Sequence, residues 1–487
     1  MLTRLRIQGF KNIVDAEVRF GPFTCIAGAN GAGKSNLFDA IQFLRDLTEF
    51  PIIEAAARVR DPQGKSGDIR AIFTQHAKPT KQKVRFEADF IVPQAVRDDF
   101  NRHTKPTATY LTYTLELAYI AASGLASERL ELVHESLTYI PASLAKKRLA
   151  FAQSPAFRES VISNERRAPY ISTEQEDGKS IIKLHQDGGS SGKPVRVPAE
   201  GSPKTLVGGN NTSDYPTVLA ARREMQSWTL LQLEPSALRQ PDPFSAEPRV
   251  AANGAHLAAT LQRLDAEATI SNQLAQLLDD VGNVSVDKDD SRRTLTLQVT
   301  GRNGVSHPAR ALSDGTLRFL ALAILAADPD AGRLLCLEEP ENGIHPSRIP
   351  AILKLLQGMA VDPNEPVGND NPLKQVVINT HSPSVISELN TADIVMVSSV
   401  RHAGIKQASF DCIEETWRAK IETEPPGQPP NTVAPGDMLA YVNAAPSGLA
   451  LPRVHTPPTQ TPKTQTVQEY MQAQLSLDFP PTEGHAR

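Results

Sequence analysis

The chain has 487 residues, with 40% hydrophobic and 22% charged side chains and a formal net charge of -4. This length predicts two or three structural units. The net charge excludes an overall basic protein but is compatible with a local basic face. No apolar run approaches the ~20 residues of a membrane span, and the N-terminus lacks the apolar core of a signal peptide.

Three cysteines, Cys25, Cys336 and Cys412, lie far apart in apolar, strand-like stretches. This pattern is typical of buried thiols in a reducing compartment and offers neither a disulfide framework nor a zinc site. We therefore predict a cytoplasmic protein with no membrane partner.

The first predicted elements in chain order include a pattern typical of a nucleotide-binding site. Residues 2–8 and 14–20 read as strands, and the apolar residues 23–27 read as a buried strand. Residues 28–35, Gly-Ala-Asn-Gly-Ala-Gly-Lys-Ser, fit the phosphate-loop pattern G-x-x-x-x-G-K-[ST], and apolar residues at helical spacing follow over 36–50.

Strand, glycine-rich loop and helix together suit a triphosphate. Glycines let backbone N–H groups approach the phosphates, and the helix N-terminus adds partial positive charge. We expect Lys34 to reach the β- and γ-phosphates and the Ser35 hydroxyl to hold Mg²⁺. The predicted nucleotide-binding residues are Asn30, Gly31, Ala32, Gly33, Lys34, Ser35 and Asn36.

The middle of the chain changes character. Residues 84–92, 110–120 and 130–140 alternate between polar and apolar residues, which predicts an antiparallel sheet with one solvated face. The more polar residues 142–216, with Gly/Ser-rich stretches, predict surface loops.

Helices and strands return afterwards. Helices are expected over 217–230 and 255–278, and a strand pair over 284–300. From 311 to 400, strands and helices alternate as in a parallel α/β sheet.

Two strands of this second α/β part end in polar residues. The apolar residues 334–337 lead into Glu338 and Glu339, at the sheet edge where ligands bind. We expect Glu338 to serve Mg²⁺, directly or through water, and Glu339 to polarise the attacking water. A strand at 374–380 ends at His381, which could sense the γ-phosphate, although a lone histidine is usually structural.

Residues 312–316, Leu-Ser-Asp-Gly-Thr, open a predicted helix that runs to 327. Ser313 is a plausible N-cap, and with Asp314 and Gly315 it forms a possible second anion site. One bound nucleotide needs only one such site, so this motif would close on the γ-phosphate held by a second subunit. An ordinary capped helix is the alternative.

The order of these motifs resembles the Walker A, signature, Walker B and H-loop of ABC-type ATPases. The opening stretches 5–12 and 30–36 look like the RecF/SMC-like branch, while 312–318 and 338–346 are similar to compact predicted ATPases of the AAA-21 type. Those proteins are prokaryotic and often tied to DNA repair or phage defence. Specific motifs cover about residues 1–60 and 300–400.

The resemblance implies that ATP and Mg²⁺ are bound by Lys34, Ser35 and Glu338, with Glu339 as catalytic base and His381 as switch. It also implies that Ser313, Asp314 and Gly315 act in trans within a homodimer. Two departures stand out: the signature reads Ser-Asp-Gly-Thr, where transporter ATPases have Ser-Gly-Gly-Gln, and Glu338 replaces the usual Asp. Gln75 is only a candidate for the Q-loop glutamine.

The predicted fold is α/β: a P-loop NTPase head of the ABC type with a split core, an antiparallel β region, an inserted helical lobe and a disordered C-terminal tail. The expected units are the first core part (1–60), a β-rich part (61–141), an inserted lobe with loops and helices (142–300), the second core part (301–421) and a Pro-rich disordered tail (422–487).

Within the tail, residues 474–479 resemble the hexapeptide by which bacterial proteins dock on the DNA sliding clamp. The anchors would be Gln474, Leu475, Leu477 and Phe479, and the alternative is an amphipathic terminal segment without a partner. Relatives in the OLD family carry a Toprim nuclease, but no Glu with an Asp-x-Asp pair follows His381. Any nuclease or effector would therefore be a separate partner.

Taken together, the motifs predict an ATP-hydrolysing head that dimerises on ATP and acts on DNA in repair or anti-phage defence. A regulatory or scaffold protein that senses ATP and works through its tail is the alternative. A transporter ATPase is disfavoured by the signature and the RecF-like N-terminus.

Overall fold

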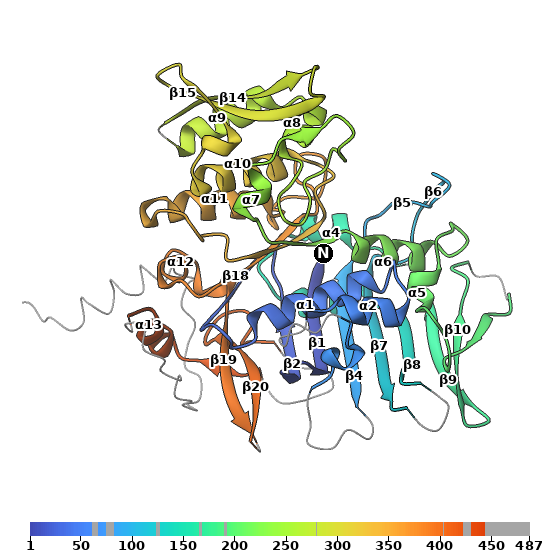
Figure 1. The fold of residues 1–487 in the computed structure, drawn as a ribbon. Coiled ribbons are helices and arrows are strands. Elements are labelled where there is room, and N and C mark those ends of the chain that lie inside the picture. The colour runs from blue at the N-terminus through green and yellow to red at the C-terminus, as the bar shows by residue number, and fades with distance from the viewer. Residues whose placement is uncertain are drawn as a thin grey trace, which may run out of the picture.

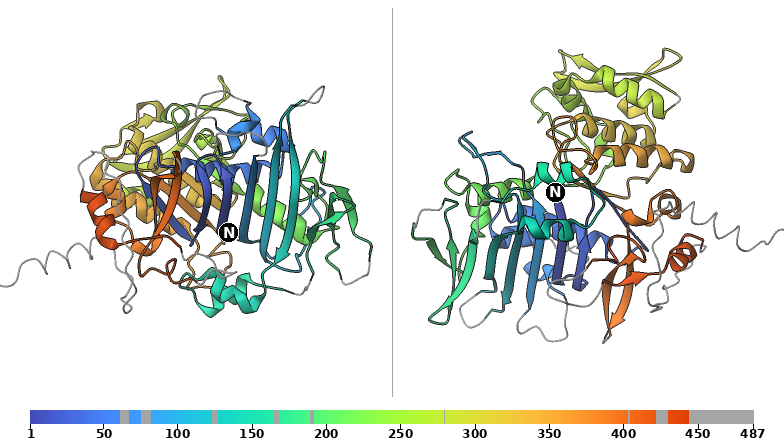
Figure 2. Two further views of the ribbon diagram at one scale, coloured as in Figure 1. Left: turned by 90° about the horizontal axis from the view of Figure 1, so that it is seen from below. Right: turned by 180° about the vertical axis from the view of Figure 1, so that it is seen from behind.

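The computed structural model describes residues 1–60, 67–74, 82–122, 127–164, 168–188, 192–278, 280–402, 404–421 and 430–443. Figure 1 shows a wide body built on two sheets and a lobe of helices and short strands above it. Figure 2 shows the same two parts from below and from behind.

A seven-stranded sheet in the order β12-β17-β18-β3-β19-β20-β21 unites distant parts of the chain. Five strands run parallel: β12 (Trp228–Leu231), β17 (Leu334–Glu338), β18 (Gln375–Thr380), β3 (Phe23–Gly28) and β19 (Ile394–His402). β20 (Ile405–Ile413) is antiparallel to β19, and β21 (Thr432–Val433) is parallel to β20. The predicted parallel α/β sheet and split core are confirmed.

Both faces of this sheet are covered. Along β3, Ile26 packs into the core that holds α1 (Lys34–Asp46), whereas Cys25 and Ala27 pack into the core that holds α10 (Asp314–Ala327). Because both faces are covered, every residue of β3 and β18 is buried, with no alternation between buried and exposed positions.

The second large sheet is antiparallel, as predicted. Its order is β11 (Val195–Pro198), β10 (Lys179–Leu184), β9 (Ile171–Glu176), β8 (Arg129–Tyr139), β7 (Tyr110–Ile120), β4 (Lys83–Ile91), β1 (Leu2–Phe10) and β2 (Ile13–Arg19). One face packs on helices that share its core: α1, α2 (Ile52–Arg58), α5 (Leu206–Gly209) and α6 (Pro216–Gln226).

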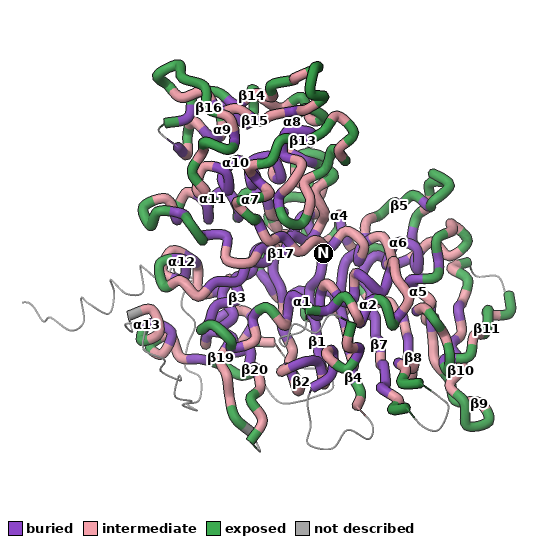
Figure 3. The backbone as a smooth tube through the Cα atoms, viewed as in Figure 1, coloured by how far each residue is buried: buried purple, intermediate pink, exposed green. Residues whose placement is uncertain are grey.

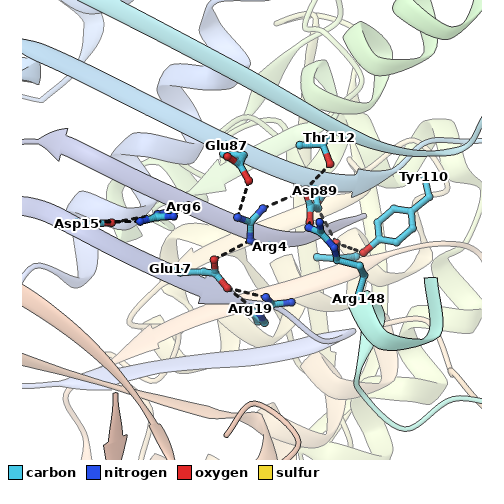
Figure 4. A network of polar contacts seen from close by, with 11 residues as sticks. Arg4, Arg6, Asp15, Glu17, Arg19, Glu87, Asp89, Tyr110, Thr112 and Arg148 are labelled. Carbon is cyan, nitrogen blue, oxygen red and sulfur yellow. Dashed lines mark hydrogen bonds and ion pairs between the residues drawn. The ribbon is translucent and has the colours of Figure 1, made fainter. Parts of the chain in front are cut away.

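The opposite face is polar. Arg4 on β1 donates to Glu17 Oε2 at 2.8 Å on β2 and to Glu87 Oε1 at 2.6 Å on β4, so the charges pair across three strands (Figure 4). Arg6, farther along β1, pairs with Asp15 at 3.2 Å where this face opens to solvent. Cross-strand pairs of opposite charge stabilise such a face.

The lobe is assembled around α10. Its helices are α7 (Pro235–Leu238), α8 (Leu257–Leu264), α9 (Glu267–Leu277) and α11 (Ile349–Met359), with a small sheet of β13 (Asp242–Pro243), β15 (Thr294–Gly301), β14 (Val281–Asp289) and β16 (Ser306–Pro308). Residues of α8 to α11 share one buried core with the seven-stranded sheet.

The remaining elements connect or flank these parts. They are η1 (Ile69–Ile72), β5 (Val96–Arg97), β6 (His103–Thr104), α3 (Ala142–Leu149), α4 (Pro155–Val161), η2 (Ala309–Ala311), η3 (Pro346–Arg348), α12 (Pro383–Ser387), η4 (Thr391–Asp393) and α13 (Pro435–Asn443). None of the helices in the described ranges is both long enough and apolar enough to cross a membrane.

Several expectations for the middle of the chain were wrong. Residues 142–300 do not form one inserted lobe: β9 to β11 extend the antiparallel sheet, and β12 joins the seven-stranded sheet. The helix predicted over 217–230 ends at Gln226, because Trp228 to Leu231 pair with β17 instead. The helix predicted over 255–278 is two helices, α8 and α9.

The tail prediction also needs correction at its start. Residues 430–443 contain β21 and α13, so disorder is wrong for this stretch. The apolar side chains of Met438 and Leu439 are buried in the lobe-side core, which the Pro-rich composition around them concealed. Residues 444–487 lie outside the described residues.

A buried carboxyl on β8 makes stability depend on pH. Glu135 is fully buried and accepts hydrogen bonds from Leu206 N at 2.7 Å and Val207 N at 3.0 Å. Burial raises its pKa from 4.5 to about 7, so the folded state holds a proton that the unfolded chain releases. Its stabilising effect is complete below pH 4.5 and is lost as the pH rises through 7.

We expect Glu135→Gln to remove this dependence. The free energy of unfolding of the variant minus that of the wild type should increase by about 3 kcal/mol from pH 4.5 to pH 7.5, because one pKa unit is about 1.4 kcal/mol. Urea unfolding at several pH values measures the difference. A difference that stays constant with pH would contradict the assignment.

Candidate nucleotide site

The phosphate loop lies between β3 and α1, as the sequence predicts. Gly31 and Gly33 have φ values of 73° and 120°, and a Cβ on Gly33 would lie 2.7 Å from the Cβ of Ala408. Lys34 Nζ donates to the carbonyl oxygens of Gly28 at 2.7 Å and Ala29 at 3.0 Å. The backbone of the loop thus encloses a buried lysine and needs glycine where it turns.

The charge of Lys34 is balanced by nearby acids. Burial lowers the pKa of the Lys34 ammonium, and the carboxylates of Glu339, Glu341 and Glu338 oppose this effect. The ammonium therefore lies near the carboxyl end of β17, where Glu338 ends the strand and Glu339 and Glu341 follow it.

A residue of the β1–β2 turn supports the loop. Asn12 Nδ2 donates to Ala32 O at 3.3 Å, and Asn12 Oδ1 accepts from Asn36 Nδ2 at 2.7 Å. Asn36, predicted to bind nucleotide, therefore contacts Asn12 and through it the loop. The sequence pattern of the loop alone contains no signal for this contact.

Glu338, the last residue of β17, is held by three segments. Arg60 donates to both carboxylate oxygens, from Nη1 to Oε2 at 3.0 Å and from Nη2 to Oε1 at 2.9 Å, and Gln232 Nε2 donates to Oε2. Burial raises the pKa of this carboxyl, but Arg60, Gln232 and the Ser35 hydroxyl together bring it below its ordinary value.

Arg60 is itself tethered. Its Nε donates to Asp39 Oδ1 at 2.6 Å, and Lys11 Nζ donates to Asp39 Oδ2 and to the Arg60 carbonyl, each at 2.5 Å. Sequence reasoning missed Arg60 and Gln232, because neither belongs to a motif and both are remote from Glu338 along the chain.

Glu339 and His381 are brought into contact. Glu339 Oε1 lies 2.7 Å from His381 Nδ1, and Glu339 Oε2 accepts from Asn342 Nδ2 at 2.8 Å. Glu339 has a φ of 44°, and its N–H donates to Asn379 O at 3.1 Å and Asn379 Oδ1 at 3.0 Å. The parallel pairing of β17 with β18 brings the two side chains together, a contact that the sequence analysis did not predict.

A third acid lies beneath this pair. Glu341 is buried, accepts from the Thr380 hydroxyl through Oε1, and its Oε2 has no hydrogen-bond partner among the described residues. Burial raises the pKa of this carboxyl. The repeated acids in Glu-Glu-Pro-Glu at 338–341 were the available signal for it.

The signature residues belong to the lobe. Ser313 caps α10 by accepting from Thr316 N at 3.2 Å, as predicted, and Asp314 pairs with Arg239. A Cβ on Gly315 would lie 3.3 Å from Gly343 O. Within the described residues, no hydrogen bond or ion pair links Ser313, Asp314 or Gly315 to the phosphate loop of the same chain.

The remaining predicted residues fall elsewhere. Gln75 and the tail anchors Gln474, Leu475, Leu477 and Phe479 all lie outside the described residues. They stay predictions.

The donor set fits a nucleotide-bound Mg²⁺. No group of three or more His, Cys, Asp and Glu in the described ranges could hold a metal alone. Mg²⁺ in such sites takes only one or two protein oxygens besides phosphates and water. The Ser35 hydroxyl and the Glu338 carboxylate contact each other and offer two such oxygens. In this structure the guanidinium of Arg60 supplies the positive charge beside the carboxylate.

Comparison with known proteins decides the family. A family model described as "AAA domain, putative AbiEii toxin, Type IV TA system", AAA_21, matches residues 23–181 and 200–387, which is well over half of the chain. The chain belongs to the AAA_21 family. The predicted resemblance to RecF/SMC-like ATPases of the AAA-21 type is confirmed.

This AAA_21 chain also has more distant likenesses. A curated relative, the DNA replication and repair protein RecF of Magnetococcus marinus, is 49% identical over 57 residues, which cover 12% of the chain and only 15% of that relative. Three solved structures each cover 84% of the chain. The SmcHead bound to the C-winged helix domain of ScpA is 14% identical with a TM-score of 0.41, over 98% of that chain. The Smc head domain of Pyrococcus furiosus bound to the C-terminal domain of ScpA is 10% identical with a TM-score of 0.43, over 96% of that chain, and the SMC head domain of Thermotoga maritima is 13% identical with a TM-score of 0.37, over 98% of that chain.

The contact between Arg60 and Glu338 gives a prediction for Mg²⁺ dependence. Arg60→Ala should lower, several-fold, the Mg²⁺ concentration that half-saturates nucleotide binding, because a guanidinium no longer competes for the carboxylate. Titration with a fluorescent ATP analogue measures it.

Arg70→Ala is the matched control, since Arg70 pairs with Asp68 at 2.9 Å on the exposed η1 turn. An unchanged or higher Mg²⁺ requirement in Arg60→Ala would show that the arginine does not compete with the metal.

Proposed function

We propose that this AAA_21 protein binds and hydrolyses ATP, dimerises around two bound nucleotides and acts on DNA. One observation carries the proposal: Lys34, Glu338 and the Glu339–His381 pair meet at the carboxyl edge of three adjacent parallel strands. Ligands of open α/β sheets bind at this edge.

Each residue has a role that its contacts support. Lys34 would turn from the carbonyls of Gly28 and Ala29 to the β- and γ-phosphates, while loop N–H groups bind their oxygens. Ser35 and Glu338 would hold Mg²⁺, which neutralises charge on the phosphates.

Glu339 is the proposed base. Its contacts with His381 Nδ1 and Asn342 Nδ2 fix the carboxylate, so that it can orient a water molecule against the γ-phosphate. His381 would hold this orientation, and would respond when the γ-phosphate leaves.

The signature motif supports a dimer. Ser313, Asp314 and Gly315 stand at the N-terminus of α10 in the lobe, without a contact to their own phosphate loop in the described residues. Such a helix end attracts anions, so we assign it to the γ-phosphate held by a second copy of the chain. ATP would join the two heads, and hydrolysis would part them.

Action on DNA, in repair or anti-phage defence, rests on the family and the short RecF match. A separate nuclease or effector, and a sliding clamp bound by the tail, are proposed partners. The alternative is an ATP-sensing scaffold, which the Arg60–Glu338 contact favours, because a carboxylate already neutralised by a guanidinium would bind Mg²⁺ slowly or weakly.

Glu339→Gln tests the proposed reaction. The amide cannot act as a base, so the steady-state ATPase rate should fall at least about 100-fold, while ATP binding persists and the dimer accumulates. Light scattering with ATP measures the dimer, and phosphate release measures the rate.

Lys34→Ala is the control and should bind no ATP and form no dimer. A Glu339→Gln variant that binds ATP yet stays monomeric would contradict the in-trans arrangement, and one with an unchanged rate would remove Glu339 as base.

A further inference from the structure

A short hairpin beside α6 presents an aromatic ring to solvent. β5 and β6 pair at Arg97 and His103, and Figure 1 shows the hairpin extending outward from the body. Phe100 at its tip is 70% exposed, and the guanidinium of Arg102 lies 5.4 Å from the ring centre. Figure 3 shows this hairpin as an exposed segment.

The turn that carries Phe100 is rigidly built. The side chain of Asp98 accepts from Phe100 N at 3.0 Å, from Arg102 N at 2.8 Å and from Arg102 Nε at 2.7 Å. The neighbouring Asp99 pairs with Arg223 of α6, which ties the turn to the body. Because these contacts fix the turn, the exposed Phe100 ring is held in a defined position, where a planar ligand can stack on it.

Beside the hairpin lies a basic cleft of about 700 Å³. Four arginines and a histidine line it, along with only two acids: Arg97, His103, Arg223, Arg249, Arg333, Asp98 and Asp330.

The positive charge of the cleft is only partly balanced. Arg223 pairs with Asp99, and Arg333 pairs with Glu224. Among the described residues, Arg97 and Arg249 have no ion pair with an acidic side chain. The two lining acids are themselves paired, Asp98 with Arg102 and Asp330 with Arg263. The cleft therefore attracts anions.

We propose that the hairpin and the cleft bind single-stranded DNA. Arginines would hold the phosphodiester backbone in the cleft, and an unpaired base would stack on Phe100. A duplex keeps its bases stacked and paired, so the exposed ring favours a single strand. The inference rests on the proposed action on DNA and adds to it a substrate form and a location.

The cleft is separate from the nucleotide site but connected to it by two strands. Arg333 and Ser227 directly precede β17 and β12, so the cleft lies at the amino edge of the sheet. β17 ends at Glu338, and Gln232 directly follows β12 and donates to Glu338. DNA in the cleft can thus affect the carboxylate through either strand.

The test is fluorescence anisotropy of a labelled 20-nucleotide oligothymidylate with the full chain, at several salt concentrations. Phe100→Ala should weaken binding about 5- to 100-fold, the usual effect of losing one stacking platform. Arg97→Ala/Arg249→Ala should weaken binding and lower the slope of log affinity against log salt by about 1.4. Arg292→Ala, whose side chain is 82% exposed on the distant β14–β15 turn, is the control and should bind like the wild type.

The outcomes separate this inference from the proposed function. If the wild type binds the oligonucleotide and all variants bind equally, the cleft is not the site, while action on DNA stands. If the wild type binds only duplex DNA, the single-strand assignment falls. If it binds no DNA but hydrolyses ATP, the inference and the DNA role both fall, and the ATPase assignment survives.

Discussion

The parallel pairing of β18 with both β3 and β17 is the constraint on which the rest of the structure depends. It joins the phosphate loop, near the N-terminus, to acids and a histidine encoded more than 300 residues later. Because all three strands run the same way, their carboxyl ends meet at one edge, where the phosphate loop, the acids after β17 and His381 directly follow their strands. Apolar side chains on both faces of these strands keep the edge fixed between two cores.

Charge balance at that edge gives the two neighbouring acids of the site different partners. Half-buried carboxylates need partners, and Glu338 obtains them from Arg60, Gln232 and Ser35, whereas Glu339 obtains them from His381 and Asn342. The two neighbouring acids thus face different partners, one cationic and one a histidine. This difference is the basis for the two proposed roles, Mg²⁺ binding for Glu338 and water activation for Glu339.

Local sequence patterns predicted much of the fold and of the candidate site. The phosphate loop, its strand and its helix follow from one contiguous pattern, and the strand predicted over 110–120 has the same bounds as β7. The sequence failed where tertiary contacts decide. β9 and β10 carry polar residues such as Glu174 and Lys183 near the sheet edge, so no apolar alternation marks them. Arg60 and Gln232 lie 278 and 106 residues from Glu338, and only the folded chain brings them together.

The central claim is that each nucleotide is shared by two chains, and mixing two inactive variants tests it most directly. Lys34→Ala lacks the phosphate-loop cation, and Ser313→Asp keeps an N-cap oxygen but places a negative charge against the partner's nucleotide. Each variant alone should be inactive, and their mixture should recover ATPase activity, because a mixed dimer contains one intact composite site. A mixture as inactive as its components would contradict the account.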